Sequence, residues 1–176
     1  PTRELAAQVA ESVATYGKNL PLTSTVVFGG VKVNPQMQRL RGGCDVLVAT
    51  PGRLLDLYQQ NAVKFDHLEV LILDEADRML DMGFQDTIDD IIDCIPTNRQ
   101  TLLFSATFPR EIKSIAKRVM LDPITVQAPS THDEATIKQN FHQVSDSQSR
   151  MIALRLLLAK HRADSALVFC NTKRDT

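Results

Sequence analysis

An apolar run that stops at a group of carboxylates is the feature that most restricts how this chain can fold. Residues 68–73 read Leu-Glu-Val-Leu-Ile-Leu, and Asp74-Glu75-Ala76-Asp77 follow directly. A short run rich in Val, Ile and Leu is typical of a strand in a parallel sheet that is covered on both faces. Ligand sites in such sheets lie beyond the carboxyl ends of the strands. The sequence therefore predicts a buried strand that delivers acidic side chains to a site.

Further strands and helices alternate along the chain. Short β-rich runs predict strands over 24–28, 45–49, 100–104 and 124–127. Apolar residues spaced three to four apart predict helices over 3–16, 35–41, 53–60, 84–95 and 109–120, with a helical turn over 77–80. This alternation predicts an α/β fold with a mainly parallel sheet and helices on both faces.

A change in composition after residue 127 predicts a domain boundary. Residues 128–134 contain Pro, Ser and charged residues without apolar periodicity, so we expect a linker over 128–135. It would separate a first domain over 1–127 from the start of a second over 136–176. In the second domain we expect strands over 137–144 and 166–170 and a helix over 148–161.

The composition is that of an ordinary globular protein, with 43% hydrophobic and 23% charged residues. No apolar run approaches the roughly 18 residues that a membrane span requires, so no membrane partner is expected. The formal net charge is -1, so any nucleic-acid binding must come from local placement of arginines and backbone amides. Three cysteines without a CxxC spacing fit a reducing, intracellular setting.

The acids after the apolar run suggest nucleotide hydrolysis. In nucleotide hydrolases of the P-loop class, an Asp at this position holds magnesium and the following Glu faces a water molecule. A single Asp after a strand is more often a helix cap or a first-turn residue, and Asp74 and Asp77 also fit those roles. However, Ser105-Ala106-Thr107 follow the next strand, and their hydroxyls could hydrogen-bond Asp77 and so sense the state of a metal site.

Three loops at strand or helix ends contain residues suited to binding phosphate. Thr50-Pro51-Gly52-Arg53 combines an N-cap residue, a proline for the first helical position, a glycine that admits a ligand and an arginine. Pro1-Thr2-Arg3-Glu4 repeats the scheme, and Gly29-Gly30 offers a third approach to the backbone. Each loop alone is more often a turn or a cap. Three together favour a continuous surface that follows phosphates.

Taken in order, these motifs resemble those of the DEAD-box ATP-dependent RNA helicases. The chain carries them as Pro1-Thr2-Arg3-Glu4-Leu5-Ala6-Ala7-Gln8, Gly29-Gly30, Thr50-Pro51-Gly52-Arg53, Asp74-Glu75-Ala76-Asp77, Ser105-Ala106-Thr107 and Val168-Phe169-Cys170-Asn171-Thr172. The resemblance spans essentially the whole chain. It implies a RecA-like first domain without its N-terminal phosphate-loop part, followed by the start of a second RecA-like domain. Residues 74–84 and 100–107 are most similar to bacterial members that act in ribosome assembly or RNA decay.

The resemblance implies a role for each motif. Asp74 would hold magnesium largely through water, and Glu75 would be the general base. Asp77 would be the third acidic residue of the catalytic site and would connect it to the coupling motif Ser105-Ala106-Thr107. Sequence-independent contacts to RNA sugars and phosphates would come from Thr2, Arg3, Gly29, Gly30, Thr50, Pro51, Gly52 and Arg53. Residues 169–172 would line the second domain's side of the cleft. The implied cofactors are ATP and Mg²⁺, and the expected location is the cytoplasm.

The family's phosphate-binding loop is not in this sequence, which contains no GxxxxGK[ST]. We therefore expect these 176 residues, as a separate molecule, neither to bind ATP tightly nor to unwind RNA, and to be poorly stable. The parent protein would be an RNA-dependent ATPase that unwinds short RNA duplexes or remodels RNA–protein complexes. The alternatives are a non-catalytic RNA-binding or scaffold module with a helicase fold, and a DNA helicase or other P-loop ATPase. Nothing in the sequence identifies a protein partner.

Overall fold

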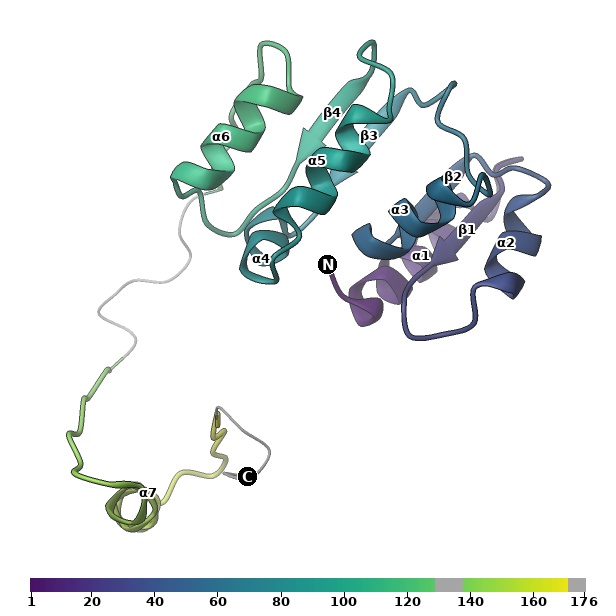
Figure 1. The fold of residues 1–176 in the computed structure, drawn as a ribbon. Coiled ribbons are helices and arrows are strands. Elements are labelled where there is room, and N and C mark those ends of the chain that lie inside the picture. Colours follow the sequence, from purple (N-terminus) through teal and green to yellow (C-terminus); the bar gives the residue numbers. More distant parts are fainter. Residues whose placement is uncertain (129–137, 171–176) are drawn as a thin grey trace. The chain divides into compact units, whose positions relative to one another are not determined.

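The computed structural model describes residues 1–128 and 138–170 and divides into two compact units, Pro1–Thr125 and Val126–Thr176 (Figure 1). The elements of the first unit are α1 (Arg3–Gly17), β1 (Ser24–Val27), α2 (Asn34–Leu40), β2 (Val46–Ala49), α3 (Pro51–Gln59), β3 (Val70–Leu73), α4 (Ala76–Asp81), α5 (Gln85–Asp93), β4 (Gln100–Leu103) and α6 (Arg110–Val119). The second unit contains α7 (Ser147–His161). Most of the linker expected over 128–135 lies outside the described residues, and the domain boundary stays a prediction.

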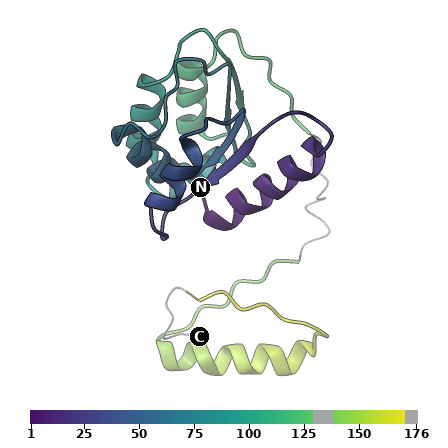
Figure 2. The ribbon, with the colours of Figure 1, turned by 90° about the vertical axis from the view of Figure 1, so that its right-hand side faces the viewer.

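The strands form two parallel pairs. β1 pairs with β2 from Ser24 opposite Val46, and β3 pairs with β4 from Val70 opposite Gln100. Each pair is a separate two-stranded sheet. Helix α1 lies on one face of the β1–β2 pair and α3 on the other (Figures 1 and 2). The prediction of an α/β fold with parallel strands and flanking helices is confirmed.

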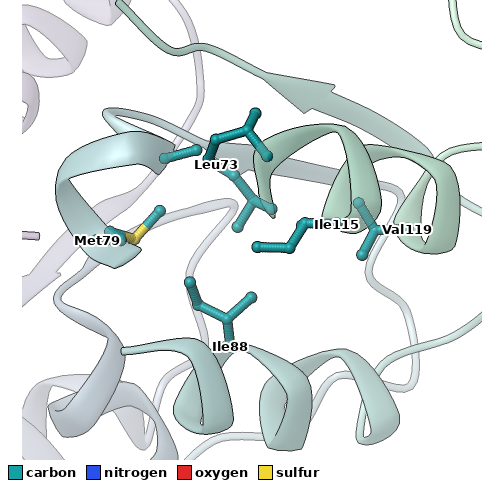
Figure 3. Close-up of a cluster of buried hydrophobic side chains, with 7 residues drawn as sticks. Leu73, Met79, Ile88, Ile115 and Val119 are labelled. Carbon is teal, nitrogen blue, oxygen red and sulfur yellow. The ribbon is translucent and has the colours of Figure 1, made fainter. Parts of the chain in front are cut away.

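Two clusters of buried apolar side chains form the core of the first unit. One packs α4, α5 and α6 against the end of β3 and contains Leu73, Ala76, Met79, Ile88, Ile112, Ile115 and Val119 (Figure 3). The other lies by β1 and β2 and contains Val27, Leu40, Leu57, Val63, Phe65 and Ile95. Leu71 of β3 packs against both clusters, so it joins the two strand pairs.

One face of β3 is open to solvent. Val70 is 43% exposed and Ile72 is 56% exposed, whereas Leu71 and Leu73 point into the core. The expectation that this strand is covered on both faces is therefore wrong for the described residues. The reason is that α4, α5 and α6 all pack on the side of Leu73, so alternate residues of the strand stay in water.

Three predicted strands do not form in the described residues. Residues 124–127, 138–144 and 166–170 belong to no strand or helix, and residue 137 lies outside the described part. Their apolar side chains are open to solvent: Ile124 is 89% exposed, Phe141 93% and Phe169 89%. A strand needs the hydrogen bonds of a neighbouring strand, so β-rich composition alone does not produce one.

The second unit is organised around α7, which agrees with the helix expected over 148–161. The carboxylate of Asp146 caps this helix by accepting a hydrogen bond from the backbone N–H of Ser149 at 2.7 Å. Within the described residues, no helix is long and apolar enough to cross a lipid bilayer.

Candidate functional site

The carboxyl ends of β3 and β4 leave the sheet side by side. The strand register sets Leu73 opposite Leu103, and the pairing continues beyond it. The N–H of Phe104 donates to the carbonyl of Leu73 at 2.8 Å, and the N–H of Ala76 donates to the carbonyl of Phe104 at 3.0 Å. Consequently the first turn of α4 starts beside the segment that follows β4.

Asp77 is held by the segment after β4. Its Oδ2 accepts hydrogen bonds from both the N–H and the hydroxyl of Thr107, each at 2.8 Å. The Ser105 hydroxyl accepts from the N–H of Asp77 at 3.2 Å and donates to the carbonyl of Thr107 at 2.7 Å. Ala106 is an exposed spacer between them. The structure thus brings together Asp77, Ser105 and Thr107, as the sequence predicts.

These hydrogen bonds favour the ionised form of Asp77. The Thr107 hydroxyl lowers the pKa of the Asp77 carboxyl most, and burial opposes it. The N–H of Thr107, the Ser105 hydroxyl and the N–H of Arg78 add to the lowering, so that the pKa is about 2. Asp77 is therefore a fixed negative charge at neutral pH.

Of the other two acids, Asp74 is exposed and Glu75 is half-buried. Asp74 is exposed at the end of β3, and its Oδ1 accepts the N–H of Glu75 at 2.9 Å. Glu75 has the left-handed backbone angles φ 51° and ψ 50°, a conformation that strains a non-glycine residue and is often found at functional sites. Its Oε2 lies 3.9 Å from Nε of Arg78. Pro1 lies nearby.

The donor set fits a magnesium ion held through water. Among the described residues, no group of three or more His, Cys, Asp or Glu side chains could hold a metal ion by itself. Magnesium in nucleotide sites usually keeps several waters and uses one or two carboxylates together with phosphate oxygens. The exposed carboxylate of Asp74 meets that requirement.

Of the eight residues predicted to contact RNA sugars and phosphates, three are exposed: Arg3, Gly30 and Gly52. Gly30 has a φ of +78°, and a Cβ built on it would lie 2.6 Å from Nη1 of Arg3. The Arg3 guanidinium therefore lies directly against the Gly30 backbone, and the positive φ of Gly30 favours glycine at this position. The first turn of α1 and the loop after β1 meet at this point.

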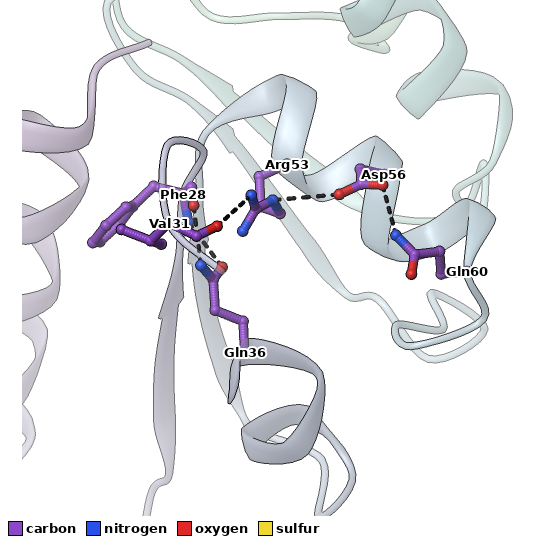
Figure 4. A network of polar contacts seen from close by, with 6 residues as sticks. All are labelled: Phe28, Val31, Gln36, Arg53, Asp56 and Gln60. Carbon is purple, nitrogen blue, oxygen red and sulfur yellow. Dashed lines mark hydrogen bonds and ion pairs between the residues drawn. The ribbon is translucent and has the colours of Figure 1, made fainter. Parts of the chain in front are cut away.

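The remaining predicted contact residues are less accessible. The hydroxyl of Thr2 caps α1 by accepting the N–H of Leu5 at 3.2 Å, and Gly29 is half-buried. Thr50 is only 7% exposed, and within the described residues its hydroxyl makes no capping bond to α3. Pro51 is buried as well. The Arg53 side chain is 11% exposed and turns inward, where Nη2 donates to the carbonyl of Val31 at 3.0 Å (Figure 4).

Two residues that the sequence analysis did not single out hold this region together. Gln36 is 5% exposed, and its amide bonds both the N–H and the carbonyl of Phe28. Asp56 pairs with Arg53, with Oδ2 at 3.4 Å from Nε. A signal for Gln36 was present: it lies four residues before Leu40, so it shares the buried face of α2 although it is polar.

Comparison with known proteins agrees with this arrangement. The model of the DEAD/DEAH box helicase family matches residues 1–115. The chain is 47% identical to the ATP-dependent RNA helicase DbpA of Escherichia coli (strain K12), over 99% of this chain and 38% of that protein. It is 38% identical to DEAD-box ATP-dependent RNA helicase 40 of Oryza sativa subsp. japonica, over 99% of this chain and 22% of that protein.

Among solved structures, a DEAD box protein from the hyperthermophile Methanococcus jannaschii matches with a TM-score of 0.71 and 39% identity. That match covers 100% of this chain and 47% of the other chain. The chain thus spans less than half the length of each of these relatives. With a family model that covers most of its length and these close relatives, the chain belongs to the DEAD/DEAH box helicase family.

Proposed function

We propose that the protein is an ATP-dependent RNA helicase, which hydrolyses ATP to unwind short RNA duplexes or to remodel RNA–protein complexes. The observation that carries the proposal is the bonded group of Asp77, Ser105 and Thr107, placed directly after Asp74 and Glu75 at the ends of β3 and β4. Membership of the DEAD/DEAH box helicase family and the names of the relatives support it. We further propose that the protein works in the cytoplasm.

In this proposal each of the three acidic residues Asp74, Glu75 and Asp77 has a different role in ATP hydrolysis. Asp74 would hold Mg²⁺ through water, and the bound ion would supply positive charge that neutralises the phosphate oxygens of ATP. Glu75 would take a proton from the attacking water. Asp77 stays ionised and would act through Thr107 and Ser105, so that the segment after β4 moves with the acid site.

RNA would bind along the exposed loop residues. Arg3 would contribute a guanidinium, and Gly30 and Gly52 would let the phosphates approach the backbone. The N–H groups of Gly52 and Arg53 in the first turn of α3 have no partner within the helix and would be available to the same phosphates. Contacts of this kind recognise sugar and phosphate, so binding would be independent of sequence.

RNA-stimulated ATP hydrolysis by the whole protein tests the proposal. We expect Glu75→Gln to abolish hydrolysis and to leave RNA binding in place, because the substitution removes the base but keeps the shape of the side chain. Glu69→Gln is the matched control, since Glu69 is exposed at the other end of the same strand segment. Its hydrolysis rate should equal that of the wild type.

Two results would contradict the proposal. Equal hydrolysis by Glu75→Gln and wild type would exclude Glu75 as the base. RNA binding by the wild type without any hydrolysis would favour a non-catalytic RNA-binding module. For the 176-residue chain alone, which has no GxxxxGK[ST], we expect no hydrolysis under the same conditions.

A further inference from the structure

Gln36 holds the beginning of the loop that contains Gly29 and Gly30. Its Oε1 accepts the N–H of Phe28 at 3.1 Å, and its Nε2 donates to the carbonyl of Phe28 at 3.1 Å. Phe28 directly follows the last residue of β1, so the side-chain amide pairs with it as a neighbouring strand would. Gln36 is only 5% exposed, and losing its amide would remove both of these bonds from the half-buried backbone of Phe28.

Arg53 holds the end of the same loop. Its Nη2 donates to the carbonyl of Val31 at 3.0 Å, and its Nε lies 3.4 Å from Oδ2 of Asp56 (Figure 4). The side chain is 11% exposed, and among the described residues Nη1 is buried without a hydrogen-bond partner. The guanidinium thus contacts the loop at Val31 and α3 at Asp56, and it does not extend into solvent.

Gly29 and Gly30 are therefore fixed from both sides. Gln36 holds Phe28, Arg53 holds Val31, and the two glycines lie between. Gly30 needs this support because its φ of +78° belongs to a conformation that a free glycine adopts only part of the time. From this geometry we infer that Gln36 and Arg53 are positioning residues for RNA, which hold the Gly29–Gly30 backbone in its binding conformation without touching phosphate.

This inference rests on the proposed function, since it assigns a role within the same RNA surface. It also assigns different roles to the two arginines. Arg3 is exposed beside Gly30 and would neutralise phosphate, whereas Arg53 would hold the Gly29–Gly30 loop in its binding conformation. The two roles differ in a measurable way. A side chain that neutralises a phosphate contributes to the salt dependence of binding, and a positioning residue does not.

The experiment measures the affinity of the whole protein for a single-stranded RNA of about ten nucleotides at several salt concentrations. We expect Gln36→Met and Arg53→Lys each to weaken binding about tenfold, because the loop must then be ordered when RNA binds. The slope of log affinity against log salt should stay at the wild-type value in these two variants and also in Arg53→Gln, which removes the charge of Arg53. Arg3→Gln should weaken binding and also reduce the slope by about 0.7.

Two controls separate positioning from general damage to the fold. Gln38→Met makes the same substitution on an exposed position of α2 and should leave affinity unchanged. Ile115→Val weakens the core and should lower the melting temperature while affinity stays at the wild-type value. Amide hydrogen exchange at Phe28 and Gly30 should become faster in Gln36→Met and stay unchanged in Gln38→Met.

Unchanged RNA affinity in both Gln36→Met and Arg53→Lys would overturn the inference, as would a reduced salt slope in Arg53→Gln. If Gln36→Met does not fold, Arg53→Lys decides the outcome, because it keeps the charge and loses only the geometry of the guanidinium. Failure of the proposed function looks different: the wild-type protein itself would show no RNA binding, which would overturn both.

Discussion

Removal of the Thr107 hydroxyl should weaken the fold by an amount that depends on pH. Thr107→Val keeps the side-chain shape and removes one of the two hydrogen bonds that Thr107 donates to Oδ2 of Asp77. The pKa of Asp77 falls from an ordinary 3.8 to about 2, and the whole difference would correspond to about 2.4 kcal/mol at about 1.4 kcal/mol per pKa unit. Because Asp77 is only half-buried and water screens its charge, we expect about 1 kcal/mol from this hydroxyl.

The pH dependence follows from the direction of the shift. The folded-state pKa of Asp77 lies below its unfolded value, so the ionised carboxylate stabilises the fold above pH 3.8 and loses that effect as the pH falls toward 2. The difference in unfolding free energy between wild type and Thr107→Val should therefore have its maximum value at pH 7. It should shrink across the window from about pH 4 to about pH 2.

A double-mutant cycle with Asp77→Asn measures this interaction by urea unfolding of the whole protein. We expect a coupling free energy of about 1 kcal/mol at pH 7. Thr15→Val is the control, because Thr15 is exposed on α1 and should show no change with pH in this window. A coupling below about 0.3 kcal/mol, or a difference that stays constant down to pH 2, would show that the Thr107 hydroxyl does not stabilise ionised Asp77.

Other substitutions test the loop and the core. Gly30→Ala should destabilise the fold by about 1 to 2 kcal/mol, since a φ of +78° strains any residue that has a Cβ, whereas Gly42→Ala has open space and should stay within about 0.5 kcal/mol. Ile112→Ala should cost about 3 kcal/mol because this side chain is fully buried, while Ile72→Thr, at a position 56% exposed, should cost less than about 1 kcal/mol. Urea unfolding measures all four, and equal losses within either pair would contradict the assignment of burial or strain.

The sequence predicts well the features that depend on local periodicity. For the helix expected over 109–120, the inward residues Ile112, Ile115, Ala116 and Val119 are all buried in α6. Pro109 stands at the N-cap instead of the first helical position, a difference of one residue. A period of 3.6 residues is encoded in the segment itself, so no knowledge of the rest of the fold is needed.

Features that depend on a partner are predicted less well. Val70 and Ile72 are apolar, yet their exposure is decided by whether another element covers that face of β3. Phe141 and Phe169 belong to β-rich segments that find no neighbouring strand in the described residues. Neither outcome can be derived from the segment alone, because hydrogen bonding and burial in a sheet are properties of a pair.

The direction of a side chain is also set by its surroundings. Arg3 and Arg53 occupy similar positions at the starts of α1 and α3, and the sequence predicts the same phosphate contact for both. The structure separates them, because the carbonyl of Val31 and the carboxylate of Asp56 draw Arg53 inward. Asp56, three residues after Arg53 on the same helix, was the one local signal of this difference.

The beginning of α1 connects the acid site to the loop surface. Pro1 lies near the carboxylates of Glu75 and Asp74, and two residues later the Arg3 guanidinium lies against Gly30. The Thr2 hydroxyl caps the helix between these contacts and keeps its first turn rigid. The first turn of α1 therefore lies beside both the carboxylates after β3 and the loop that Gln36 and Arg53 hold.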